Sequence, residues 1–171
     1  MIVGNKIILR TWSENDLLAL QTIRNDFQLQ QQLMAQPREN SLEQVKQWLT
    51  KKTESEDSLL FVIEIKQSNA VAGYVQVVEI NFDSGSGRLG ICILPSLQGR
   101  GYGYEAITLL EKHLSEYHKL RKLVLEVLSK NENALHLYRK LKFKEVGRLR
   151  HHFFIDNEYC DSVIMEKFLQ P

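Results

Sequence analysis

The order of predicted elements places this chain in the α+β class, with a mixed, mostly antiparallel sheet flanked by helices. Three observations predict this fold: two helical patterns near the start, three adjacent strands in the middle, and a helix–strand–helix segment before a final hairpin. Runs of neighbouring strands followed by helices are typical of α+β proteins. The chain has 171 residues, so residues 1–171 are predicted to form a single domain.

The first part of the chain is predicted to contain one strand and two helices. Residues 6–10 are interpreted as a short strand. Ser13 suits a helix N-cap, and the apolar residues after it recur at helical spacing as far as Ile23. Ser41 and Gln44 have the spacing of a capping box, which indicates that a second helix begins there.

The middle of the chain is rich in apolar and β-branched residues, which predicts strands over residues 59–65, 71–82 and 88–94. A turn-like segment at residues 67–70 joins the first two strands, so they are predicted to form a hairpin. A second turn, at residues 83–87, contains two glycines and leads into the third strand.

The last part of the chain alternates helices and strands. A helix is predicted from about residue 101 to residue 117, where apolar residues recur three, four and seven positions apart. His113 lies on this apolar stripe and is interpreted as a core histidine rather than a ligand. Asp156 and Asn157 suit the tight turn of a closing hairpin. The other predicted elements are a strand at 122–128, a helix at 131–142, and paired strands at 143–154 and 159–168.

The composition is that of an ordinary soluble globular protein. Hydrophobic residues make up 43% of the chain, charged residues 25%, and the formal net charge is +1. This charge excludes a global field that would draw the protein to nucleic acid or to a membrane. No apolar run has the length of a membrane span or of a signal peptide. We therefore expect a cytoplasmic protein with no nucleic-acid or membrane partner.

The two cysteines do not indicate a metal site. Cys92 and Cys160 form no CxxC pair, and no Cys/His cluster has the spacing of zinc ligands. Cys92 lies in an apolar run and is interpreted as a core residue. We expect buried free thiols and no bound metal.

A glycine-rich loop between a strand and a helix carries the clearest chemical signal. Glycine allows a ligand to approach the backbone closely and permits a positive φ. A helix start adds free N–H groups and the positive end of the helix dipole, which together suit a pyrophosphate. Arg100 adds charge at the rim. The residues of this loop are Gln98, Gly99, Arg100, Gly101, Tyr102 and Gly103.

Three other interpretations of the loop are weaker. A P-loop would need a lysine followed by Ser or Thr, and neither follows here. Residues 101–106 match the alanine variant of the dinucleotide fingerprint, with Glu126 at a suitable distance. That fingerprint opens a βαβ unit, whereas antiparallel signals precede this loop. The third alternative is a plain glycine turn.

The loop and a later segment resemble the GNAT superfamily of N-acetyltransferases. The acyl-CoA signature of that family is Q/R-x-x-G-x-G/A, and residues 98–103 match every fixed position. Residues 131–143 are similar to its N-x-x-A-x-x-x-Y-x-x-x-G-F helix, except that Lys142 replaces the usual glycine. The resemblance covers nearly the whole chain and implies a GNAT-like fold with acetyl-CoA as cosubstrate.

Individual segments resemble different branches of this family. The start and the closing hairpin look like the ribosomal-protein and spermidine acetyltransferase branch, and residues 77–81 resemble the spermidine enzymes. Residues 23–26 instead resemble acetyltransferases that act on nucleotide-linked amino sugars. The resemblance therefore leaves three candidate acceptors: a polyamine, a protein N-terminus or an amino sugar.

The resemblance also assigns residues that hold the cosubstrate. Backbone groups of Ile91, Cys92 and Ile93 would hold the pantetheine arm like an added strand, and an N–H near Ile93 would meet the thioester oxygen. The loop from Gln98 to Gly103 would hold the pyrophosphate. Asn131 matches the asparagine that contacts CoA; without the resemblance it is a helix N-cap.

The catalytic assignments follow the same resemblance. Tyr138 matches the tyrosine that protonates the departing thiolate; its alternative role is helix packing. A phenol with a pKa of about 10 is protonated at neutral pH and can act as a general acid. Many relatives carry a glutamate where this chain has Arg88, so Glu79 on the preceding strand becomes the candidate base. His151 or His152 is a further candidate, although adjacent strand residues face opposite sides.

The predicted function is transfer of the acetyl group from acetyl-CoA to a primary amine by direct attack. The alternative is a non-catalytic acyl-CoA-binding or sensing domain. Arg88 keeps that alternative open, while Tyr138 argues against it, because binding needs no acid. A homodimer formed through the edge of the final strand pair is a further expectation.

Overall fold

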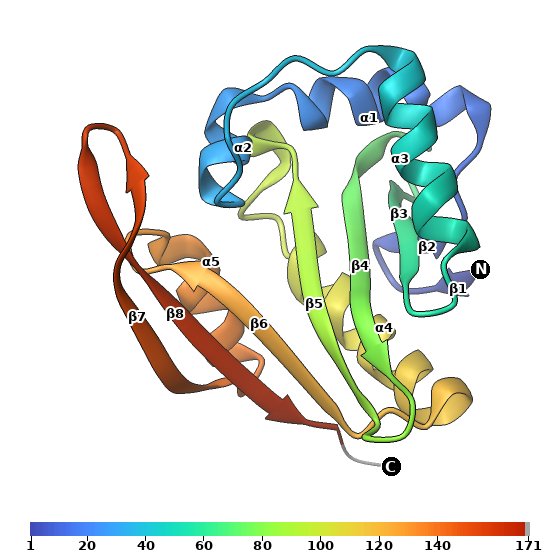
Figure 1. Cartoon of the computed structure of the whole chain (residues 1–171). Helices are drawn as coiled ribbons and strands as arrows, with labels where there is room; N and C mark the ends of the chain where they lie inside the picture. Colours follow the sequence, from blue (N-terminus) through green and yellow to red (C-terminus); the bar gives the residue numbers. More distant parts are fainter. Residues whose placement is uncertain (170–171) are drawn as a thin grey trace.

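The computed structural model describes residues 1–169 as an eight-stranded sheet with helices on both faces (Figure 1). Gln170 and Pro171, the end of the predicted 1–171 domain, lie outside the described residues. The strands are β1 (Ile2–Val3), β2 (Ile7–Arg10), β3 (Leu59–Ile65), β4 (Val71–Asn81), β5 (Ser86–Ile93), β6 (Lys122–Leu128), β7 (Lys144–Ile155) and β8 (Glu158–Phe168). The helices are α1 (Leu17–Arg24), α2 (Phe27–Gln32), α3 (Leu42–Glu54), α4 (Tyr102–His118) and α5 (Glu132–Lys140).

The strands of the described residues lie in the order β1-β2-β3-β4-β5-β6-β8-β7. Every neighbouring pair is antiparallel except β5 and β6. This topology confirms the predicted α+β fold with a mixed, mostly antiparallel sheet. The turn of the final hairpin has positive φ at Asp156 (53°) and Asn157 (62°), as its two-residue turn requires.

The parallel pair of β5 and β6 is short. Residues 86–88 pair with residues 122–124, and the pairing stops there. Beyond Arg88 the two strands diverge, and Figure 1 shows the gap widening towards the tip of β5. β5 therefore keeps an edge without a β6 partner from Leu89 to Ile93. The candidate site lies along this edge.

The sheet buries a hydrophobic cluster on each face. α4 and α5 cover one face, where Leu110 packs into the same cluster as Leu123 of β6. α1, α2 and α3 cover the other face, where Leu49 shares a cluster with Tyr74 of β4 and Cys92 of β5. Cys92 is buried, as expected, and so is the second free thiol of the chain. Residues of β5 thus contribute to both faces.

Some short elements differ from the predicted ones. The helix expected from Ser13 opens as a 3₁₀ turn, because the Asp16 carboxylate accepts the Ser13 N–H at 2.7 Å and an Arg10 N–H at 2.8 Å. α1 begins after this turn. β1 and α2 escaped prediction, since two-residue and six-residue segments are too short to show a period. The capping box of Ser41 and Gln44 opens α3 as predicted.

The apolar stripe of α4 ends earlier than predicted. His113 is half-buried and lies edge-on to Phe61, with ring centroids 5.7 Å apart. Burial and the neighbouring His118 lower the pKa of His113, as expected for a histidine packed against the core. Tyr117, expected on the same stripe, is 73% exposed because the last turn of α4 extends past the sheet cluster.

Replacing Leu110 of α4 by alanine is expected to lower the free energy of unfolding by about 2–5 kcal/mol, because its side chain is completely buried between α4 and the sheet. Urea denaturation followed by circular dichroism measures this loss. Leu18→Ala on α1 is the matched control: that side chain is 68% exposed, so the change should stay below about 0.5 kcal/mol. Equal losses in both variants would contradict the assignment of Leu110 to the core.

Candidate active site

The glycine loop joins the tip of β5 to α4 through a short 3₁₀ turn, Pro95–Leu97. Gly99 has a φ of 74° and Gly101 a φ of 86°, a backbone region that side chains disfavour. A Cβ at Gly101 would lie 3.4 Å from the Nζ of Lys6, and one at Gly99 would meet nothing within 4 Å. Both glycines are therefore required by the backbone conformation and not by crowding.

Gly103 has a different role, because its φ is ordinary and its surroundings are crowded. A Cβ there would lie 3.2 Å from Leu137 of α5 and 3.3 Å from Ile93 of β5, with Ile91 next at 3.8 Å. The missing side chain lets the first turn of α4 approach both β5 and α5. It also shows that Ile91 and Ile93 point towards α4, whereas Cys92 points to the opposite face.

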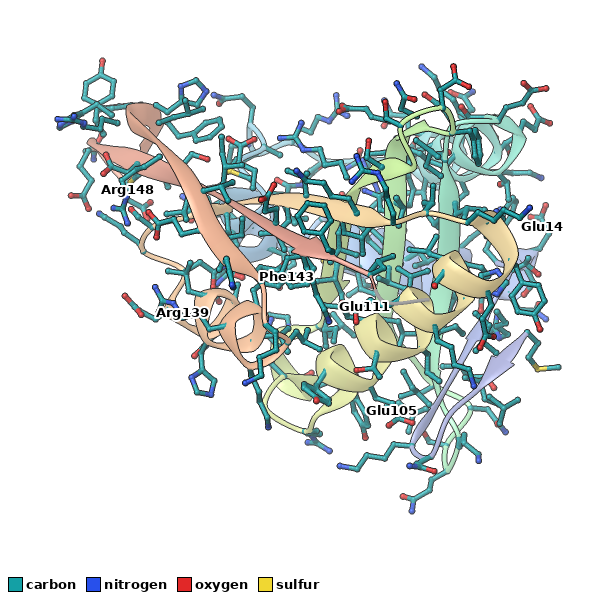
Figure 2. The ribbon with its side chains drawn as sticks, turned by 90° about the horizontal axis from the view of Figure 1, so that it is seen from below. Glu14, Glu105, Glu111, Arg139, Phe143 and Arg148 are labelled. Carbon is teal, nitrogen blue, oxygen red and sulfur yellow. The ribbon has the colours of Figure 1, made fainter. Side chains whose placement is uncertain are left out.

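Side chains around the loop hold it in place. The Nε2 of Gln98 donates to the carbonyl of Ile93 at 2.9 Å, which ties the loop to β5. The Nζ of Lys6 donates to the carbonyl of Arg100 at 3.1 Å. Glu105, labelled on α4 in Figure 2, accepts the backbone N–H of Lys6 at 3.0 Å. The loop is thus fixed to β5 on one side and to the β1–β2 turn on the other.

The start of α4 offers hydrogen-bond donors to an anion. The first bond within the helix runs from the Glu105 N–H to the Gly101 carbonyl. The earlier N–H groups have no helical acceptor, and they point out of the positive end of the helix dipole. Arg100 adds an exposed guanidinium at the rim. These donors fit the pyrophosphate of acetyl-CoA; they belong to Tyr102, Gly103 and Tyr104.

The open edge of β5 suits the pantetheine arm. Ile91 and Ile93 pair with β4 on one side, and on the other side β6 has already diverged. Backbone N–H and C=O groups that face this gap are free to bind an extended ligand, as a further strand would. The Leu94 N–H donates to the Ala72 carbonyl of β4, so alternation along the strand directs the backbone groups of Cys92 to β4 and those of Ile91 and Ile93 to the gap. Of the three residues expected to hold the arm, Ile91 and Ile93 therefore suit that role, and the backbone of Cys92 does not.

Tyr138 lies on α5 and is almost completely buried, with 7% of its surface exposed. Burial raises the pKa of Tyr138 to about 12, with a smaller contribution from Cys92. Burial also raises the pKa of the Cys92 thiol to about 12. The phenol and the thiol are therefore both protonated at neutral pH. Asn131 caps α5, since its Oδ1 accepts the Ala134 N–H at 3.2 Å.

Glu79, the candidate base, lies at a bulge of β4 with a φ of 52°. Its exposed carboxylate lies 3.7 Å from the guanidinium of Arg88. Arg88 also forms an ion pair with Glu126 of β6, and Glu126 accepts the Ser162 hydroxyl at 2.5 Å. Arg88, at the position where many relatives carry a glutamate, therefore forms ion pairs with two carboxylates, those of Glu79 and Glu126.

The histidines of the final hairpin stay apart from these groups. The His151 ring lies 6.5 Å from Tyr159, and the His152 ring 4.8 Å from Phe153, centroid to centroid. Both partners belong to the same hairpin. Within residues 1–169, the contacts of these histidines do not include Tyr138 or Glu79.

Sequence reasoning missed a cavity of about 300 Å³ between α1, α2 and the sheet. Tyr74 and Cys92 form its sheet side, so it reaches the same strand that holds the proposed thioester position. Arg24 and Arg38 line it from the helical side. The sequence contains little indication of this cavity, because the residues of α2 and of the loop after it show no periodic apolar pattern.

The described part of the chain shows neither a cluster of metal-ligating side chains nor a membrane-spanning helix. Among residues 1–169, no group of three or more His, Cys, Asp or Glu side chains is placed to hold a metal ion. None of the helices in that range is both long and apolar enough to cross a membrane.

Comparison with known proteins identifies the family. A family model described as an acetyltransferase (GNAT) domain matches residues 6–144. Spermidine N(1)-acetyltransferase of Vibrio cholerae is 28% identical over 171 residues, covering 98% of each chain. The enzyme of the same name from Escherichia coli K12 is 30% identical over 162 residues, which is 95% of this chain and 86% of that one.

Solved structures agree with these relatives. Spermidine N-acetyltransferase from V. cholerae, in complex with CoA and spermine, aligns with a TM-score of 0.89 at 26% identity and covers 97% of both chains. A GNAT-family acetyltransferase from Bacillus anthracis, at 15% identity, shares the fold with a TM-score of 0.84. The predicted acetyl-CoA-dependent N-acetyltransferase is thereby confirmed as the activity, with acetyl-CoA as cosubstrate. The chain belongs to the GNAT family of acetyltransferases.

Proposed function

We propose that the acetyl group passes directly from acetyl-CoA to a primary amine at the opening between β5 and α5, with Tyr138 as general acid. The observation that carries this proposal is the open edge of β5 from Leu89 to Ile93, which leads into the glycine loop. Tyr138 is buried, which raises its pKa and keeps the phenol protonated at neutral pH. The amine nitrogen attacks the thioester carbon, and a C–N bond forms. As the C–S bond breaks, the phenol gives its proton to the CoA sulfur.

The charge that develops during attack needs donors already in place. A backbone N–H near Ile93 is our proposed partner for the tetrahedral oxyanion, since β5 has an open edge there. Gln98 and the N–H groups of Tyr102 and Gly103 hold the pyrophosphate in this proposal. Asn131 contributes its remaining amide hydrogens to CoA. The glycines at 99 and 101 give the loop its shape.

The attacking amine must lose a proton before it can react. An alkylamine has a pKa of about 10.4, so only a small fraction is neutral at pH 7. We propose Glu79 as the group that accepts this proton, through water, because its carboxylate is exposed. The guanidinium of Arg88 lies 3.7 Å from this carboxylate.

The acceptor is a primary amine, and the relatives indicate where to begin. The V. cholerae and E. coli enzymes are named for spermidine. A polyamine is therefore the first of the three candidate acceptors to test, before a protein N-terminus and an amino sugar. CoA release with spermidine, N-terminal peptides and amino sugars is the direct measurement. Acetyl-CoA binding without release on any amine would favour the binding-only alternative.

We further propose that residues 1–171 act as one domain in the cytoplasm and form at least a homodimer. One hydrophobic cluster contains both Ile7 and Leu169, which supports a single domain. A spermidine N-acetyltransferase from V. cholerae is described as dodecameric. Exposed apolar side chains on the final hairpin, such as Leu149 and Phe154, supply a surface for association.

Tyr138→Phe is expected to lower kcat by about 10²–10⁴-fold while acetyl-CoA affinity changes by less than about twofold, because only the transferable proton is removed. Steady-state CoA release and calorimetric titration measure the two effects. Tyr117→Phe is the control. It changes an exposed tyrosine of α4, the helix that follows the glycine loop, and should leave kcat and acetyl-CoA affinity unchanged. An unchanged kcat in Tyr138→Phe would show that another group is the acid.

The pH profile gives an independent check. The acid must be protonated, and its pKa of about 12 lies above that of the amine. The rate should therefore rise as the amine deprotonates, with no decline from Tyr138 before about pH 12. A declining limb between pH 7 and 9 that disappears in Tyr138→Phe would contradict the raised pKa.

Gly101→Glu is expected to abolish acetyl-CoA binding, because it puts a negative charge at the phosphate site and a side chain at a φ of 86°. Isothermal titration calorimetry measures the loss. Gly85→Glu places the same side chain at another positive φ (64°), in the turn before β5. That control should lose stability and keep acetyl-CoA binding. Retained binding in Gly101→Glu would mean that the phosphates bind elsewhere.

A further inference from the structure

The cavity beside Cys92 is positively charged. Arg24, at the end of α1, and Arg38, in the loop before α3, line it. The other polar side chains of its lining carry no charge at neutral pH; they are Gln30, Gln36, Asn40, Tyr74 and Cys92. Within residues 1–169, neither guanidinium forms an ion pair with a carboxylate.

Arg24 is held in a fixed position with a donor unused. Its guanidinium stacks on the Trp48 ring at 4.0 Å from the centroid, which orients the planar group. Its Nε is buried and has no hydrogen-bond partner in the part of the chain that the structure describes. A buried charged donor without an acceptor is unfavourable. A ligand that brings an acceptor would satisfy it.

Carboxylates near the cavity have other partners. Asp26 contributes to the raised pKa of Cys92, but its Oδ1 accepts the Leu29 N–H at 2.9 Å and so caps α2. Asp26 is not part of the cavity lining. Elsewhere on the same face Arg88 is neutralised by Glu79 and Glu126. Asp26 nevertheless keeps its negative charge close to Cys92, so the two guanidinium groups of the lining leave the cavity with an excess of one positive charge rather than two.

We propose that this cavity binds an anionic group, a carboxylate or a phosphate, of the acceptor whose amine is acetylated. This inference rests on the proposed transfer at β5, because Cys92 belongs both to the cavity and to the strand that holds the thioester. Guanidinium groups bind carboxylate and phosphate oxygens in a matching planar geometry. A polycation without an anionic group would bring like charge to Arg24 and Arg38.

The test compares acceptors that differ only in the anionic group. Lysine is compared with cadaverine for a carboxylate, and O-phosphoethanolamine with ethanolamine for a phosphate; spermidine is included as a polycation. We expect the anionic member of at least one pair to have a kcat/KM at least about tenfold higher than its partner. The pair with the larger ratio identifies the anion. Spermidine as the best acceptor, or no preference in either pair, would overturn the inference.

Two variants link the preference to the cavity. Arg38→Gln in an exposed loop and Arg24→Gln on α1 should each remove most of the preference, while kcat/KM for cadaverine and ethanolamine, which lack the anionic group, changes by less than about twofold. Arg121→Gln is the matched control: this arginine donates to the Ser84 carbonyl at 2.9 Å, outside the cavity. If Arg24→Gln fails to fold, Arg38→Gln decides alone. A preference that survives in Arg38→Gln would contradict the proposal.

The proposal and the transfer reaction can fail separately. Acetylation of amines without any preference for an anionic group would retain the transferase and reject the cavity assignment. If no amine is acetylated, the proposed transfer fails, and binding still tests the cavity. In that case lysine and O-phosphoethanolamine should raise the melting temperature of the wild-type protein with CoA and leave Arg38→Gln unchanged. An equal shift in both proteins, or none, would reject the cavity.

Discussion

The site depends on one constraint in the sheet: β5 and β6 are paired over only three residues before they separate. If β6 paired with β5 along its whole length, its hydrogen bonds would occupy the backbone N–H and C=O groups on that edge of β5 from Leu89 to Ile93. Because the strands diverge, these groups keep a free edge inside a protein that buries hydrophobic clusters on both sheet faces. Leu137 of α5 and Ile93 of β5 both lie close to Gly103, so α5 packs beside the strand that carries Cys92.

The glycine loop is held in place by hydrogen bonds within the protein. Gln98 ties it to the end of β5, and Lys6 and Glu105 tie it and the first turn of α4 to the β1–β2 turn. Gly103 lets α4, α5 and β5 meet closely, so the start of α4 lies next to the open edge of β5. Such preorganisation reduces the ordering cost of binding an extended cosubstrate.

Alternate side chains of β5 point to opposite faces of the sheet and have different surroundings. Ile91 and Ile93 pack towards α4, where the apolar cluster supports the loop, while Cys92 faces the cavity under α1 and α2. On that second face, Arg88 is paired with carboxylates and Arg24 is not. The guanidinium of Arg24 therefore lies at the cavity, and that of Arg88 lies further along the strand between its two carboxylates.

The sequence by itself determined the longer helices and strands in their order, the family and the loop, because these depend on local signals: apolar periods, capping pairs and glycines next to a helix start. It also identified Tyr138 and Asn131 through a contiguous motif. Only the tertiary structure decided that β5 and β6 diverge, that Arg88 bridges Glu79 and Glu126, and that Arg24 lies unpaired beside Cys92. These features join residues far apart in the chain, and their energies depend on burial and partner geometry, which no local pattern encodes.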